Sequence, residues 1–160
     1  MSVSSEGTKK LRTTAQKFCQ AFLSPPAPEE LLSTYFTSSP KITEHGPSWA
    51  NERLPFLGKT FTGTEECVSY FTLLSEVLEV QLPCDAFPES KDGYVVDVDA
   101  DGGKGVVSVK AKGRFVSKKT GKGWDEEFAY RLSGFDDDGK IGWWEIWADP
   151  LSAWVAVGGD

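Results

Sequence analysis

The sequence predicts an α+β fold in which three N-terminal helices pack on the concave face of a cone-like, curved antiparallel sheet. Apolar residues recur at helical spacing in three segments before residue 80, and they alternate with polar residues from residue 84 to residue 149. Helices followed by a run of strands are typical of an α+β plan. An amphipathic sheet needs a cover on its apolar face, and the helices supply it.

The size of the chain suits one domain. With 160 residues it can bury one sizeable core, and it shows neither an internal repeat nor a linker. We therefore interpret residues 1–160 as a single domain that begins with a polar tail of about residues 1–7. Cys19, Cys67 and Cys84 are odd in number and far apart, and there is one histidine, so we expect no disulfide framework, no metal and no cofactor.

The charge balance limits the partners. The net charge is −7, which repels nucleic-acid phosphates and anionic lipid surfaces. The first residues are polar, and nowhere do eighteen apolar residues run together. We therefore expect a cytoplasmic protein that binds neither nucleic acid nor membrane.

The first half of the chain predicts three helices. The first begins near Thr8 and ends before Pro25, the second begins at Pro28, and the third begins at Thr64. Residues 37–63 are rich in Gly, Pro, Ser and Thr but carry aromatic residues. We expect a short strand at residues 42–47 there, and otherwise a long loop that forms a lid or a site.

The second half predicts a meander of four long strands with turns at residues 101–103, 120–121 and 137–139. Two-residue turns at these points set a trial register, in which Arg114 lies opposite Glu127 and Tyr130 opposite Trp147. This register puts three carboxylates on the helix-covered, aromatic face, those of Glu126, Glu145 and Asp149. It leaves an apolar outer face, which predicts a homodimer formed through Phe135, Trp144 and Ile146.

The end of the chain carries the most specific motif. The segment GKIGWWEIWADPL resembles the last strand of the SnoaL-like branch of the nuclear transport factor 2-like superfamily. The matching residues are Gly139, Lys140, Ile141, Trp144, Trp147, Asp149, Pro150 and Leu151. The resemblance implies a cone-shaped α+β fold. In size and aromatic lining the chain is similar to small fungal pocket proteins that rearrange polyketide, terpenoid or alkaloid intermediates without a cofactor.

Four side chains are candidates for proton transfer. Glu145, between two tryptophans, would be desolvated and suited to general acid–base work, or it could be a structural carboxyl paired with Arg or Tyr. Asp149 could move protons at the mouth of the cone, or cap a last helix before Pro150. His45 could act as a base or substrate donor, and Tyr130 could stabilise a developing oxyanion. The alternative for each is a structural residue with a satisfied hydrogen bond. We interpret Glu126 as a solvated residue at the sheet edge.

The aromatic lining gives the expected ligand class. The candidate binding residues are Trp49, Phe56, Tyr70, Tyr94, Phe128, Trp143 and Trp147. Together with the carboxylates they predict a cofactor-independent isomerase, cyclase or dehydratase that acts on a small apolar organic molecule. A non-catalytic module that binds a hydrophobic molecule or a protein is the alternative. A third reading is a structural dimer whose cone is filled by its own tryptophans.

Overall fold

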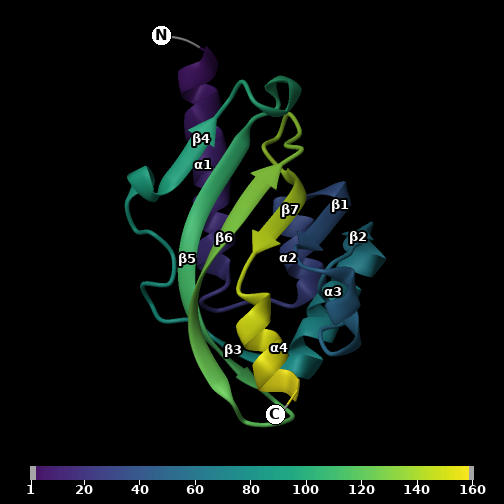
Figure 1. The fold of residues 1–160 in the computed structure, drawn as a ribbon. Helices are drawn as coiled ribbons and strands as arrows, with labels where there is room; N and C mark the ends of the chain where they lie inside the picture. Colours follow the sequence, from purple (N-terminus) through teal and green to yellow (C-terminus); the bar gives the residue numbers. More distant parts are fainter. Residues whose placement is uncertain (1–2, 159–160) are drawn as a thin grey trace.

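The computed structural model describes residues 3–158, which form four α-helices and seven strands (Figure 1). The helices are α1 (Val3–Ala21), α2 (Pro28–Tyr35), α3 (Thr64–Val77) and α4 (Pro150–Gly158). The strands are β1 (Phe36–Glu44), β2 (Thr60–Thr62), β3 (Leu78–Gln81), β4 (Tyr94–Asp97), β5 (Val106–Ser117), β6 (Gly123–Ser133) and β7 (Ile141–Trp147).

The strands form one curved sheet in the order β2-β1-β7-β6-β5-β3, and β4 pairs with β5 beside β3. All pairs are antiparallel except β1 with β7, which is parallel. The α+β class is thus confirmed, but the sheet is mixed rather than purely antiparallel. The long stretch of chain between β1 and β7 supplies the crossover that a parallel pair requires.

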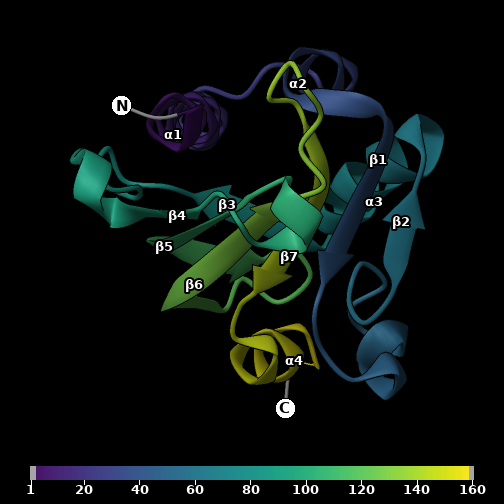
Figure 2. The same ribbon diagram turned by 90° about the horizontal axis from the view of Figure 1, so that it is seen from above.

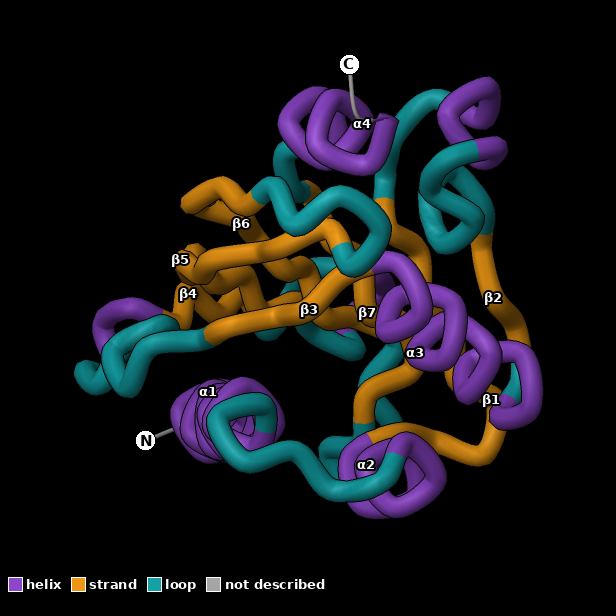
Figure 3. The backbone as a smooth tube through the Cα atoms, turned by 90° about the horizontal axis from the view of Figure 1, so that it is seen from below, coloured by secondary structure: helices purple, strands orange, loops and turns teal. Residues whose placement is uncertain are grey.

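The first three helices lie along one side of the strands, and α4 lies apart from them (Figure 3). Helix α1 contacts β4 and β5, whereas α2 and α3 contact β1. Figure 2 shows α1 and α2 above the curved sheet and α4 below it. Phe18 of α1 packs edge-on against Phe36 and Trp144, so aromatic contacts join helix and sheet at the centre of the core.

The ends of the first elements differ from the sequence prediction. Helix α1 begins at Val3, so most of the predicted polar tail of residues 1–7 is helical; residues 1 and 2 lie outside the described range. In the predicted loop of residues 37–63, residues 37–44 belong to β1 and residues 60–62 to β2, and the stretch between them holds a short 3-10 helix at Ser48–Glu52. The strand expected at residues 42–47 is thus the end of β1, where it pairs with both β2 and β7. The nine-residue strand β1 was not recognised in full because its Thr, Ser and Pro residues resemble those of a loop. The strand β3 was not predicted, and β4 is a short strand where a long one was expected.

The register between β5 and β6 differs by two residues from the prediction. Arg114 lies opposite Asp125, not Glu127, and the two side chains form an ion pair of 3.2 Å. A two-residue shift keeps every side chain on its predicted face, because the side-chain period of a strand is two residues.

The register between β6 and β7 differs by one residue, which moves every β7 side chain to the opposite face. Tyr130 lies opposite Ile146, and Leu132 lies opposite Trp144. The cause is the connection: it is not a two-residue turn but a longer loop, in which the N–H of Asp136 donates to the carbonyl of Lys140. Trp144 and Ile146 therefore face the helices, and Glu145 faces outward.

This shift also overturns the predicted dimer surface. Phe135, Trp144 and Ile146 are only 4%, 3% and 5% exposed within a single chain. They belong to its core, so they cannot form an outer sheet face. The homodimer itself stays a prediction, which now needs a different surface.

The search for membrane-spanning helices covers residues 3–158. None of the helices there combines the length and the apolar character that a bilayer span requires.

Candidate functional site

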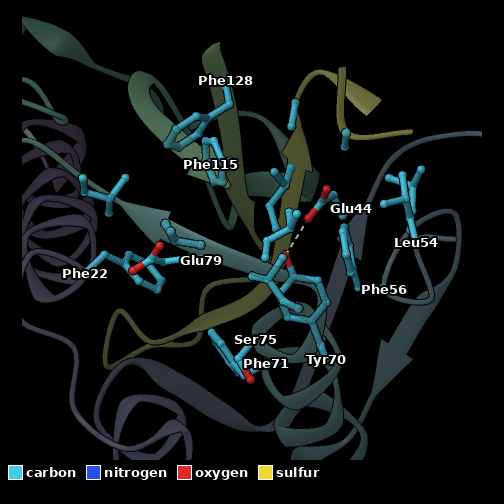
Figure 4. Close-up of a pocket in the computed structure, with 18 of the residues that line it drawn as sticks. Phe22, Glu44, Leu54, Phe56, Tyr70, Phe71, Ser75, Glu79, Phe115 and Phe128 are labelled. Atoms are coloured by element: carbon cyan, nitrogen blue, oxygen red, sulfur yellow. Dashed lines mark hydrogen bonds between the residues drawn. The ribbon is translucent and has the colours of Figure 1, made fainter. Parts of the chain in front are cut away.

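A cavity of about 910 Å³ opens on the concave side of the sheet (Figure 4). It lies between α3, the strands β6 and β7, the end of β1 and the start of α4. Its volume is in the range of small-molecule sites. The walls are predominantly apolar, and their aromatic residues are Phe22, Phe56, Tyr70, Phe71, Phe115, Trp124, Phe128, Tyr130 and Trp144.

Glu44 is the most deeply buried carboxyl in the cavity wall. As the last residue of β1 it is only 9% exposed, and the hydroxyl of Tyr70 on α3 donates to its Oε1 at 2.7 Å (Figure 4). Within residues 3–158, Oε2 has no hydrogen-bond partner. Burial raises the pKa of Glu44 to about 7; the Tyr70 hydrogen bond lowers it, and the nearby Glu126 carboxyl raises it further. Glu44 can thus exchange a proton near neutral pH.

Glu126 on β6 is the second carboxyl of the cavity. Its Oε1 accepts from the indole N–H of Trp124 at 3.0 Å, and its Oε2 accepts from the backbone N–H of Asp149 at 2.8 Å. Burial raises its pKa, although both hydrogen bonds lower it. The prediction of a solvated Glu126 at the sheet edge is therefore wrong.

Asp149 lines the same cavity and also caps α4. Its Oδ1 accepts from the N–H of Ser152 at 3.0 Å, and the Ser152 hydroxyl donates to its Oδ2 at 2.5 Å. Pro150 follows at the first helical position, as the capping interpretation expects. A role in proton transfer stays a prediction.

Tyr130 lies in the cavity wall as predicted, on β6 beside Trp144. Burial raises the pKa of the Tyr130 phenol well above its usual value, and the same holds for Tyr70. Both hydroxyls are therefore protonated at neutral pH, so they can serve as hydrogen-bond donors but not as bases.

Glu145 and His45 lie on the outer face of the sheet and do not line the cavity. The guanidinium of Arg131 donates to Glu145 Oε2 at 2.8 Å, and His45 Nε2 lies 3.0 Å from Glu145 Oε1. The His45 ring stacks on Trp147 at 4.2 Å. Trp143, on the same face, donates from its indole N–H to Thr43 Oγ1. Glu145 is thus a buried carboxyl paired with an arginine, which is the structural alternative that the sequence left open for it.

The other predicted binding residues divide between the cavity and the rest of the molecule. Phe56, Tyr70 and Phe128 line the cavity. Trp49 is 68% exposed and packs against Trp154, and buried Tyr94 donates to the carbonyl of Pro88. Neither lines the cavity. Most of the residues that line the cavity were therefore not among the binding residues expected from the sequence.

Glu44 is the principal residue that the sequence analysis missed. A signal was present: in the segment ITEHGP, strand alternation places Glu44 on the same face as Ile42, which is buried. His45 was selected instead because it is the one histidine of the sequence. Alternation places His45 on the opposite face from Glu44.

The carboxyls of the cavity do not form a metal cluster. Within residues 3–158, no three or more His, Cys, Asp or Glu side chains are grouped so that they could hold an ion. The arrangement instead offers one proton-exchanging group, Glu44, in an enclosure of aliphatic and aromatic side chains.

Neither a protein-family model nor a curated protein matches this sequence. The fold matches that of an NTF2-like protein from Burkholderia xenovorans at 15% identity, with a TM-score of 0.68 over 93% of this chain and 96% of that one. A Bacillus subtilis protein provisionally named an isomerase shares 15% identity at a TM-score of 0.65, covering 96% of both chains. A Jannaschia protein provisionally named a SnoaL-like polyketide cyclase shares 15% identity at 0.63, covering 95% of this chain and 94% of that one.

Such identities establish the fold alone. They confirm the fold that the closing motif implied, but these neighbours come from bacteria, and the finer likeness to fungal pocket proteins is not supported.

Proposed function

This chain has the NTF2-like fold, and we propose that it is a cofactor-independent acid–base enzyme of the isomerase or cyclase type. Its substrate is a small apolar molecule held in the aromatic cavity, and Glu44 takes and returns the proton. The carrying observation is the Glu44 carboxyl, buried in the cavity wall with one oxygen free and a pKa of about 7. The names of the isomerase-like and cyclase-like neighbours agree with this reaction class.

The proposed chemistry assigns a role to each cavity group. The Tyr70 hydroxyl holds Oε1 of Glu44, so that Oε2 is directed at the substrate. Ionised Glu44 removes a proton from a carbon next to a carbonyl and returns it at a second position or to the oxygen. The Tyr130 hydroxyl is the candidate donor to the enolate oxygen that develops. Glu145, the leading sequence candidate, takes no part because it faces outward.

A non-catalytic binding module is the second candidate. Oε2 of Glu126 and both oxygens of Asp149 accept hydrogen bonds at the start of α4, and Oε1 of Glu126 accepts from the Trp124 indole. Their burial therefore has a structural explanation that needs no reaction. In this reading Glu44 recognises a ligand and transfers no proton.

Proton exchange distinguishes the two candidates without a known substrate. Apolar cyclic ketones and diketones are incubated with the protein in D₂O at pH 8, and loss of the α-proton signal is followed by NMR. We expect catalysed exchange of ketones that bind, and a loss of about 100-fold in Glu44→Gln. The matched control is Glu127→Gln, a change at an exposed outer-face carboxyl. Unchanged exchange by Glu44→Gln would refute the assignment, and ketones that bind without exchange would favour the binding module.

A further inference from the structure

The cavity has an excess of negative charge on its inner wall. Three carboxyls line it there, those of Glu44, Glu126 and Asp149. The remaining charged lining residues, Glu79 and Lys118, are exposed. Among the ion pairs of residues 3–158, none includes any of the three inner carboxyls. In the described part of the chain, the three acidic groups on the inner wall of the cavity therefore have no ion-pair partner.

Glu44 differs from the other two carboxyls in its free oxygen. Both oxygens of Glu126 and both of Asp149 accept hydrogen bonds from the protein. Glu44 is nine-tenths buried, and in the part of the chain that the structure describes its carboxyl accepts a hydrogen bond only on Oε1, from Tyr70. A buried carboxylate is costly unless it is paired, so this site favours an occupant that brings a positive charge to Oε2.

The surrounding rings favour the same kind of occupant. Tyr70 lies edge-on to Phe56 and Phe61 and contacts Trp144, which in turn contacts Tyr130. Tyr70, Phe56, Trp144 and Tyr130 all line the cavity with Glu44. The faces of aromatic rings attract cations, most strongly where water is excluded. Rings and carboxylate together form the usual surroundings of an organic ammonium group.

We propose that the cavity takes an apolar molecule that carries one cationic nitrogen, seated between Oε2 of Glu44 and the surrounding aromatic rings. The inference rests on the proposed function for the location of the site and adds the charge of the substrate. It excludes carboxylate-bearing and phosphate-bearing ligands, which the three acidic side chains repel.

Binding of such a cation is coupled to the ionisation of Glu44. The titratable groups around its carboxyl are Tyr70 of α3 and Glu126 and Tyr130 of β6, and of these only Glu126 can carry charge near neutral pH. A cation pairs with the ionised form of Glu44. Its affinity therefore increases as the pH rises through about 7, where Glu44 loses its proton.

Two ligands of the same shape test the proposal. Trimethyl(2-phenylethyl)ammonium carries a permanent positive charge, and (3,3-dimethylbutyl)benzene is its neutral carbon isostere. Neither ligand titrates, so any pH dependence belongs to the protein. At pH 8.5 we expect the cation to bind at least about tenfold more tightly than the isostere, and this preference to fall about tenfold or more at pH 5.5. Titration calorimetry or quenching of the cavity tryptophans measures both affinities.

Variants assign the effect to Glu44. In Glu44→Gln the preference for the cation is lost at both pH values, whereas Glu127→Gln keeps it. Equal binding of the two ligands at pH 8.5, binding of neither, or a cation preference that survives Glu44→Gln would each overturn the proposal. A preference for the cation without ketone exchange would support this inference and refute the proposed enzyme activity. Ketone exchange without a preference for the cation would support the enzyme activity and refute this inference.

Discussion

At the scale of single residues, two buried glutamates show how local partners decide what a carboxyl does. Arg131 donates to Oε2 of Glu145 and compensates its charge, and His45 lies beside Oε1, so both oxygens have a polar partner. Among residues 3–158, the Glu44 carboxyl has the Tyr70 phenol as its single hydrogen-bond partner and forms no ion pair. A paired carboxylate stabilises its surroundings, whereas an unpaired one costs stability but stays available for chemistry. Burial alone does not distinguish the two.

Replacing Glu44 by Gln should stabilise the protein in a pH-dependent way. In the folded protein the pKa of Glu44 is about 7, which lies above its ordinary value of 4.5. The protein keeps its full stability at low pH, where Glu44 is protonated, and loses part of it as the pH rises through 7 and the buried carboxyl ionises. Glutamine keeps an acceptor for Tyr70 and never ionises. We expect Glu44→Gln to exceed the wild type by about 3 kcal/mol at pH 8.5 and by less than about 1 kcal/mol at pH 5.

Urea unfolding at the two pH values measures this difference, with Glu127→Gln as the matched control that should show none. A gap between Glu44→Gln and the wild type that stays constant from pH 5 to pH 8.5 would mean that Glu44 titrates normally in the folded protein.

At the scale of elements, the loop between β6 and β7 determines which residues reach the cavity. Gly134 adopts a positive φ of 64°, and a Cβ on Gly142 would come within 2.4 Å of the Gly134 carbonyl oxygen. This close approach fixes how the chain enters β7. Turn residues in the sequence located the loop but not its length, and one residue of error placed Trp143 and Glu145 in the cavity instead of Trp144 and Ile146.

Helix α4 depends on Asp149 as its N-terminal cap. Asparagine caps helices about as well as aspartate, and alanine does not. Asp149→Ala should therefore cost about 1 kcal/mol of unfolding free energy, whereas Asp149→Asn should cost only a few tenths. Urea denaturation of both variants measures this. Equal losses in the two variants would show that the charge of Asp149 matters and the cap does not.

At the scale of the whole molecule, the sequence predicted the parts that depend on local patterns. Helical periodicity located α2 and α3 well, and alternation identified β5 and β6 as long amphipathic strands. The candidate site depends on contacts between distant segments. Tyr70 reaches Glu44 from 26 positions away, and Asp149 reaches Glu126 from 23. No local pattern encodes such pairs, so Tyr70 was selected as a wall residue without its partner.

The corrected β7 register gives the outer sheet face two different halves. On β5 and β6, Lys110 and Arg114 pair with exposed acids. On β7, Trp147 is 44% exposed and stacks on His45, with half-buried Trp143 on the same face. Exposed tryptophans of this kind are typical of the centre of a protein–protein interface.

The predicted homodimer therefore places this tryptophan-bearing half of the sheet against its copy, because a two-fold interface brings the same patch from each chain together. We expect light scattering at micromolar concentration to give twice the chain mass of 17.5 kDa. Trp147→Glu should reduce this to one chain, since it would bury two like charges at the centre of the interface. Trp49→Glu, at a tryptophan packed against α4 instead, should leave the dimer intact. A monomeric wild type, or a Trp147→Glu variant that still dimerises, would remove this face from consideration.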